Sequence, residues 1–74
     1  DIPEVALQGA PLAIGSLLKQ AQLAPSSSEA LRLVDQGGVR IDGATISDKG
    51  LKLVAGTYVV QVGKRKFARI TLAA

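Results

Sequence analysis

Four cationic side chains fall within six residues near the end of the sequence: Lys64, Arg65, Lys66 and Arg69. Long cationic side chains gathered in this way can contact the phosphate groups of a nucleic acid. Residues 52–74 hold five basic side chains and no acidic one, whereas residues 1–51 hold four basic and six acidic ones. This asymmetry favours a polyanionic partner more than the net charge of +3 does by itself. The alternative is a solvated turn whose charges keep the sheet edge from pairing with other chains.

Serine hydroxyls form a second candidate site, just ahead of an apolar stretch that is expected to be helical. Ser26 and Ser27 would lie, with free backbone N–H groups, at the positive end of that helix's dipole, where a phosphate can bind. Ser26 also precedes Glu29 by three residues, the spacing of a capping box, so N-capping accounts for this serine without any ligand. Arg32 lies one turn further along the helix. Arg40 lies between two apolar residues of an expected strand, so its side chain should point to solvent, where it is a candidate phosphate or ribose contact. The alternative is that Arg40 is an ordinary exposed strand residue.

The composition excludes most catalytic chemistry. The chain holds no Cys and no His, which removes zinc sites, disulfides, thiol nucleophiles and imidazole acid–base catalysis. Its carboxylates are accounted for one by one by a capping box, a helix surface and turns, so they form no acid–base pair and no calcium loop. We therefore expect no catalytic residue, no metal and no cofactor within these residues.

The length of 74 residues allows one small domain. The longest apolar runs fall far short of the ~20 residues that span a bilayer, and neither predicted helix has the basic polar face of a membrane-surface helix, so no membrane partner is expected. The chain begins at Asp1 rather than Met, and we expect it to be a piece of a longer protein from a reducing, cytoplasmic environment. Its two aromatic residues, Tyr58 and Phe67, are expected to pack in the core, because two are too few for a platform on which bases stack.

The first part of the chain predicts a helical hairpin. Residues 1–10 contain a proline and a glycine without sustained periodicity, and we interpret them as a linker or an incoming extended arm. The domain proper, residues 11–74, is expected to begin with a helix over residues 11–22 that has proline at its first turn. Ser26 opens a second helix, which Gly37 ends as a left-handed residue. The two helices share one apolar side.

The second part predicts antiparallel strands. After residue 38 the apolar period changes from 3.6 to 2, and the pair Asp42-Gly43 is a strong signal for a two-residue hairpin turn. Residues 58–62 and 66–72 are rich in β-branched and aromatic side chains, with residues 63–65 as the turn between them.

Two separated motifs carry a family resemblance. Residues 26–34 (SSSEALRLV) followed by residues 36–43 (QGGVRIDG) resemble the signature of the small RNA-binding domain named after ribosomal protein S-four. Residues 56–69 (GTYVVQVGKRKFAR) narrow the resemblance to the C-terminal domain of bacterial tyrosyl-tRNA synthetases. The resemblance covers about residues 10–72 and contains both motifs in the family's order.

The resemblance implies an α+β fold, in which a helical hairpin (the alpha-L motif) packs on a small, mostly antiparallel sheet. It implies a non-catalytic module that binds tyrosine tRNA in the cytoplasm by phosphate contacts and shape. ATP and tyrosine would bind in a catalytic domain outside these residues, residues 1–10 would be the tether, and the isolated domain would be a monomer although the parent enzyme is a homodimer. The alternatives are an S-four-like domain of another RNA-modifying or ribosome-associated protein, or a protein-interaction module.

Carried over residue by residue, the resemblance implies an RNA-binding set on one exposed side of the domain: Ser26, Ser27, Arg32, Arg40, Lys64, Arg65, Lys66 and Arg69. Three positions depart from the family pattern. Ser27 stands where many members have Lys or Arg, Leu31 stands where many have Arg, and Gln22 stands where a helix-ending Gly is usual. The lost cations shift the expected contact toward the C-terminal hairpin, and Gln22 must either adopt a left-handed backbone or end its helix differently.

Overall fold

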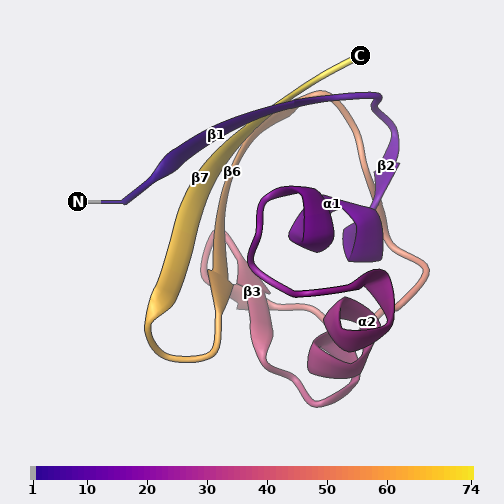
Figure 1. Ribbon diagram of the computed structural model, residues 1–74, viewed down its shortest axis with the longest axis vertical. Helices are drawn as coiled ribbons and strands as arrows, with labels where there is room; N and C mark the ends of the chain where they lie inside the picture. The colour runs from indigo at the N-terminus through magenta and orange to yellow at the C-terminus, as the bar shows by residue number, and fades with distance from the viewer. Residues whose placement is uncertain (1) are drawn as a thin grey trace.

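The computed structural model describes residues 2–74, which form two helices, a five-stranded sheet and a two-stranded sheet (Figure 1). In chain order the elements are β1 (Glu4–Gln8), β2 (Leu12–Ala13), α1 (Ile14–Gln20), α2 (Ser27–Asp35), β3 (Val39–Ile41), β4 (Ala44–Thr45), β5 (Lys52–Leu53), β6 (Gly56–Val62) and β7 (Lys66–Ala73). The expected α+β class is confirmed.

The large sheet has the strand order β1-β7-β6-β3-β4. Its centre is the long antiparallel hairpin β6–β7, which β3 extends on one side in antiparallel fashion and β1 on the other in parallel fashion. Both helices pack against one face of this sheet (Figure 1). Along β7 the side chains alternate as a half-buried sheet requires: Ala68, Ile70 and Leu72 are buried, and the residues between them are exposed. The second face of the sheet, called here the outer face, therefore presents its side chains to solvent.

The core lies between the helices and the inner face of the sheet. Its largest fully buried side chains come from both helices and from three strands: Ile14, Leu17, Leu18, Val34, Val39, Val60, Ile70 and Leu72. The helices approach each other closely at Gly15, where a Cβ atom would lie 3.2 Å from the side chain of Leu31. This burial holds the hairpin β6–β7 in a fixed position relative to the helix ends.

The end of α2 follows the sequence expectation. Gly37 has φ 73°, its N–H donates to the Val34 carbonyl (3.0 Å), and the Gly38 N–H donates to the Leu33 carbonyl (2.9 Å). This pair of hydrogen bonds is a Schellman motif, which satisfies carbonyls that the helix end leaves free. The predicted left-handed residue at position 37 is confirmed.

The end of α1 uses the same motif without a glycine. Gln22 has φ 62°, its N–H donates to the Lys19 carbonyl (3.0 Å), and the Leu23 N–H donates to the Leu18 carbonyl (2.9 Å). Leu18 and Leu23 are both buried, which supplies the hydrophobic contact that accompanies the motif. Of the two routes open to Gln22, the chain takes the left-handed one.

Of the two interpretations of residues 1–10, the incoming extended arm describes residues 4–8 and the linker does not. These residues form β1 in parallel register with β7, where Glu4 pairs with Arg69, and Asp1 lies outside the described residues. Val5 and Leu7 face the core and are half-buried, a period-2 pattern too short to stand out beside its flanking turn residues. The helix also begins later than expected, at Ile14, since residues 12–13 pair with β5. Pro11 therefore precedes a short strand and is not in the first turn of the helix.

The two aromatic residues differ in their surroundings. Tyr58 packs against the core as expected, and its hydroxyl donates to the Val54 carbonyl (2.7 Å). Phe67 is 37% exposed, so the expectation of core packing is wrong for this residue. Its position on β7 points to the outer face, where its cross-strand partner is Gln61.

Candidate nucleic-acid interface

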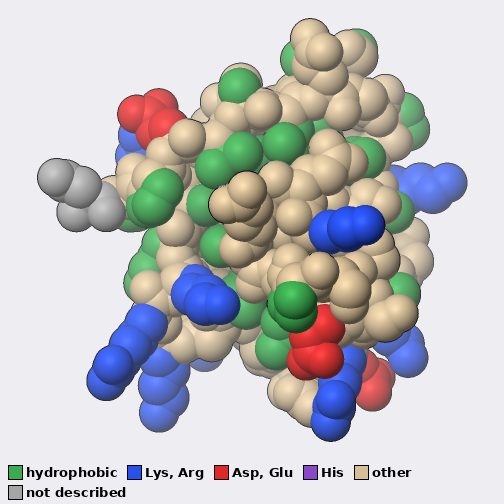
Figure 2. Space-filling view, in the orientation of Figure 1, with side chains coloured by type: hydrophobic (Ala, Val, Ile, Leu, Met, Phe, Trp, Pro, Cys, Tyr) green, Lys and Arg blue, Asp and Glu red, His purple; other side chains and the backbone are tan. Residues whose placement is uncertain are grey.

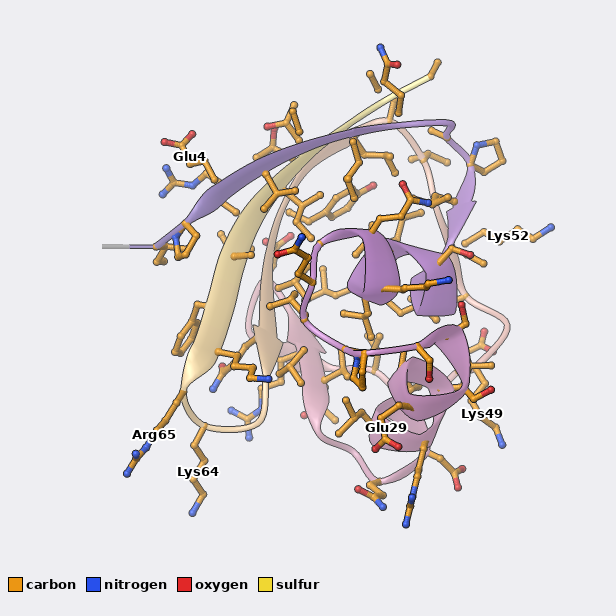
Figure 3. The ribbon with its side chains drawn as sticks, viewed as in Figure 1. Glu4, Glu29, Lys49, Lys52, Lys64 and Arg65 are labelled. Carbon is orange, nitrogen blue, oxygen red and sulfur yellow. The ribbon has the colours of Figure 1, made fainter. Side chains whose placement is uncertain are left out.

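The tip of the β6–β7 hairpin carries three adjacent cations: Lys64, Arg65 and Lys66. The pair Val62 and Lys66 closes the turn, Gly63 takes φ 68°, and the Gln61 amide donates to the Gly63 carbonyl (3.0 Å). Figure 3 shows Lys64 and Arg65 projecting from this tip into solvent. Within residues 2–74 the ion pairs join Arg32 to Glu29 and Lys49 to Asp35, so neither pair occupies a tip cation. The three side chains are therefore free to meet an external anion.

A groove separates the hairpin tip from α2. Pro25, Glu29 and Leu33 line its helix side, and the three tip cations line its strand side. Figure 2 shows Lys and Arg side chains gathered over the tip, and the carboxylate that lines the groove, Glu29, comes from the helix side. The strand side of the groove offers an RNA backbone a cationic rim, and the helix side combines apolar side chains with Glu29.

Arg40 joins the tip from the outer face of the sheet. It is exposed on β3 and pairs in register with Gln61 of β6. A hollow beside it is lined by both Arg40 and Lys64, together with the glycines at positions 37, 38 and 63. The glycines leave the backbone open there, so one phosphate-bearing strand can reach both cations.

A cation that sequence reasoning missed lies on the opposite side of the tip. Lys19, in the last turn of α1, lines one hollow together with Gln22, Pro25 and Lys66. The sequence places Lys19 and Lys66 47 residues apart, and no local pattern connects them. Only the packing of α1 against the hairpin brings the two ammonium groups to one surface.

Arg32 and Arg69 lie outside this cluster. Arg32 is on the solvent side of α2, where its side chain is 68% exposed and its guanidinium is 3.7 Å from the Glu29 carboxylate. Arg69 is on the outer face in register with Glu4 of β1, so a carboxylate stands beside it in the sheet. The neighbouring carboxylates reduce the positive potential that these two arginines present to a polyanion.

The serines before α2 take structural positions. The Ser26 hydroxyl oxygen accepts a hydrogen bond from the Glu29 N–H (3.2 Å), which is the N-cap that the capping-box spacing predicts. Ser27 begins α2, and its carbonyl oxygen faces Gly15 of α1, where it would lie 3.5 Å from a Cβ atom. The structure thus brings Arg40 and the three tip cations together, adds Lys19, and leaves the serines, Arg32 and Arg69 apart.

Comparison with known proteins identifies the fold family. A family model described as "S4 domain" matches residues 5–69, a range that begins within β1 and ends within β7. The chain belongs to the S4 domain family. Its large sheet, with two helices on one face, is the α+β arrangement of an S4 domain.

Curated relatives of this S4 domain carry one common name. The chain is 74% identical over 74 residues to the tyrosine–tRNA ligase of Burkholderia lata and 73% identical over 74 residues to that of Burkholderia thailandensis. It is 62% identical over 73 residues to the tyrosine–tRNA ligase of Bordetella avium. These alignments cover 99–100% of the chain but only 18% of each relative. The 74 residues thus correspond to an S4 domain alone, and most of each relative lies outside the match.

No helix within residues 2–74 is long and apolar enough to cross a membrane. No group of three or more His, Cys, Asp or Glu side chains in the same range could hold a metal ion.

Proposed function

We propose that this S4 domain is the non-catalytic tRNA-binding module of a tyrosine–tRNA ligase. The observation that carries the proposal is the hairpin tip, where three cations that form no ion pair within residues 2–74 share one end of the molecule with Arg40 and Lys19. The name of the relatives indicates which RNA meets this surface, namely the tyrosine tRNA.

The chemistry proposed for the tip is phosphate recognition. Lysine and arginine side chains that contact RNA phosphates release condensed counterions, which supplies affinity without reading sequence. Lys64, Arg65 and Lys66 carry the main contact, and Arg40 extends it across the outer face. Arg32 and Arg69 contribute less, since Glu29 and Glu4 stand beside them.

The benefit of such a module comes from tethering. Once a catalytic domain elsewhere in the parent protein holds the tRNA, contact by the S4 domain becomes intramolecular and needs little affinity of its own. ATP and tyrosine then bind outside these residues, and the module works in the cytoplasm, where tRNA is charged. A weak isolated interaction that becomes strong in the whole enzyme is the expected behaviour.

An NMR titration of the isotopically labelled 74-residue chain with a tyrosine tRNA transcript tests the proposal. We expect shift changes to concentrate at the amides of residues 61–66 and Arg40, while the amides of Lys49 and Lys52 stay in place. Figure 3 shows these two lysines on the side of the molecule away from Lys64 and Arg65, so they serve as an internal control. Spectra that do not change with tRNA, or changes centred on residues 49–52, would contradict the proposal.

A further inference from the structure

Gln22 occupies a backbone conformation that glycine adopts far more readily. Its φ of 62° lies in the left-handed region, where an ordinary side chain is strained. The Schellman motif that it completes uses only its backbone N–H, so the fold makes no use of the side chain in this role. The side-chain hydrogen bonds found within residues 2–74 do not involve the Gln22 amide, and the residue is exposed. Strain retained at an exposed polar side chain suggests a role outside the fold.

The surroundings of Gln22 are those of an anion site. Two hollows meet at this residue, and both are also lined by Lys66. One hollow is also lined by Lys19, Ala24 and Pro25. The other is also lined by Arg65, Phe67 and apolar side chains. No carboxylate lines either hollow within residues 2–74. Cations from two different elements, α1 and β7, therefore flank a neutral amide donor.

We propose that Gln22, Lys19 and Lys66 form a subsite for one phosphate of the bound RNA. The two ammonium groups hold the phosphate from opposite walls of the hollow, and the Gln22 amide donates a hydrogen bond to one of its non-bridging oxygens. The subsite rests on the proposed tRNA-binding function and extends the interface from the hairpin tip to the end of α1. The side chain at position 22 is then kept for the ligand, although glycine would suit the backbone better.

The test measures both the thermal stability and the tRNA affinity of one variant. A structural role and a binding role of the Gln22 side chain predict different combinations of these two results. In Gln22→Gly the strain is removed, so we expect the melting temperature of the 74-residue chain to rise, followed by circular dichroism. The same variant loses the amide donor, so we expect its affinity for a tyrosine tRNA transcript to fall by about fivefold to tenfold in fluorescence anisotropy. A variant that is more stable and binds equally well overturns the subsite.

Lys19→Gln provides a second route to the same decision. Lys19 is exposed, so this variant is expected to keep the wild-type melting temperature. The slope of log K against log salt should become shallower by about one, because one phosphate contact is lost. Lys49→Gln, on the other side of the molecule, is the matched control and should leave binding unchanged. An unchanged slope in Lys19→Gln overturns the subsite whatever Gln22→Gly does to the fold.

Failure of the subsite can be told apart from failure of the proposed function. If Lys64→Gln weakens tRNA binding but Gln22→Gly and Lys19→Gln do not, the tip binds RNA and the subsite alone is rejected. If the wild-type chain binds no tRNA at low salt, both proposals are rejected together.

Discussion

Neutralising two cations at the hairpin tip should change the salt dependence of tRNA binding by a predictable amount. If Arg40, Lys64, Arg65 and Lys66 each contact one phosphate, log K should fall with log salt at a slope of about −3. That slope corresponds to a loss of affinity on the order of 60-fold between about 50 and about 200 mM salt. In the double variant Lys64→Gln/Arg65→Gln, two contacts are gone, so the slope should be shallower by about 1.5.

The matched control removes the same amount of charge from another place. Lys49→Gln/Lys52→Gln also lowers the net charge by two, but these side chains project from the side of the molecule away from the tip (Figure 3). Lys49 is moreover 3.7 Å from the Asp35 carboxylate, so part of its charge is already balanced. We expect this control to keep the wild-type slope, with only a small loss of affinity from the weaker long-range field.

The assay is fluorescence anisotropy of a labelled tyrosine tRNA transcript, titrated with each chain at four or more salt concentrations. Circular dichroism melts should show that both double variants keep the wild-type fold, because all four side chains are exposed. Equal changes of slope in the two double variants would show that binding depends on overall charge, and the localisation of phosphate contacts at the tip would be refuted.

Two further predictions concern how the fold holds the interface. Asp42, at φ 52° in the turn of the β3–β4 hairpin, accepts a hydrogen bond from the Val59 N–H (3.0 Å), so Asp42→Ala should lower the free energy of unfolding by about 2 kcal/mol. Asp42→Asn keeps both the acceptor and the tolerance for this backbone, and urea denaturation should find it close to wild type; equal losses in the two variants would contradict this account. Leu17 is fully buried, so Leu17→Ala should cost about 2–5 kcal/mol, enough to unfold much of so small a domain, whereas Leu17→Met should cost under about 1.5 kcal/mol. Thermal melts of the two Leu17 variants that coincide with wild type would show that the packing described around α1 is wrong.

Features that depend on near neighbours in the chain were predictable. The Ser26 cap, the left-handed Gly37 and the Asp42-Gly43 turn all arise from contacts within about four residues. The hairpin of residues 58–62 and 66–72 is of the same kind, since its β-branched strands flank a short turn. The motifs that resemble the S4 family, and from which the α+β class was predicted, also lie within short stretches of sequence.

Features that join distant segments were missed or wrongly assigned. β1 pairs with β7 across more than sixty residues, in parallel register, so the short period-2 pattern of residues 4–8 does not by itself indicate which strand they join. The same pairing places Glu4 in register with Arg69, so the positive potential that Arg69, a predicted RNA contact, presents to a polyanion is reduced. The small number of aromatic residues favoured core packing for Phe67, but side chains alternate along β7, and its place in that alternation turns Phe67 to the outer face.

The sequence by itself determined which residues are cationic, where α2 begins and ends, the Asp42-Gly43 turn, and that the basic residues 64–66 would lie at a hairpin tip. Only the tertiary structure decided which cations act together, because that depends on strand register and on how α1 packs against the sheet. Lys19 and Arg40 lie beside the tip on different elements, while Arg69 is in register with Glu4 on the neighbouring strand. The charge of each side chain can be taken from the sequence, but the electrostatic potential at the surface depends on the distances between the charges. The packing of the buried core fixes those distances.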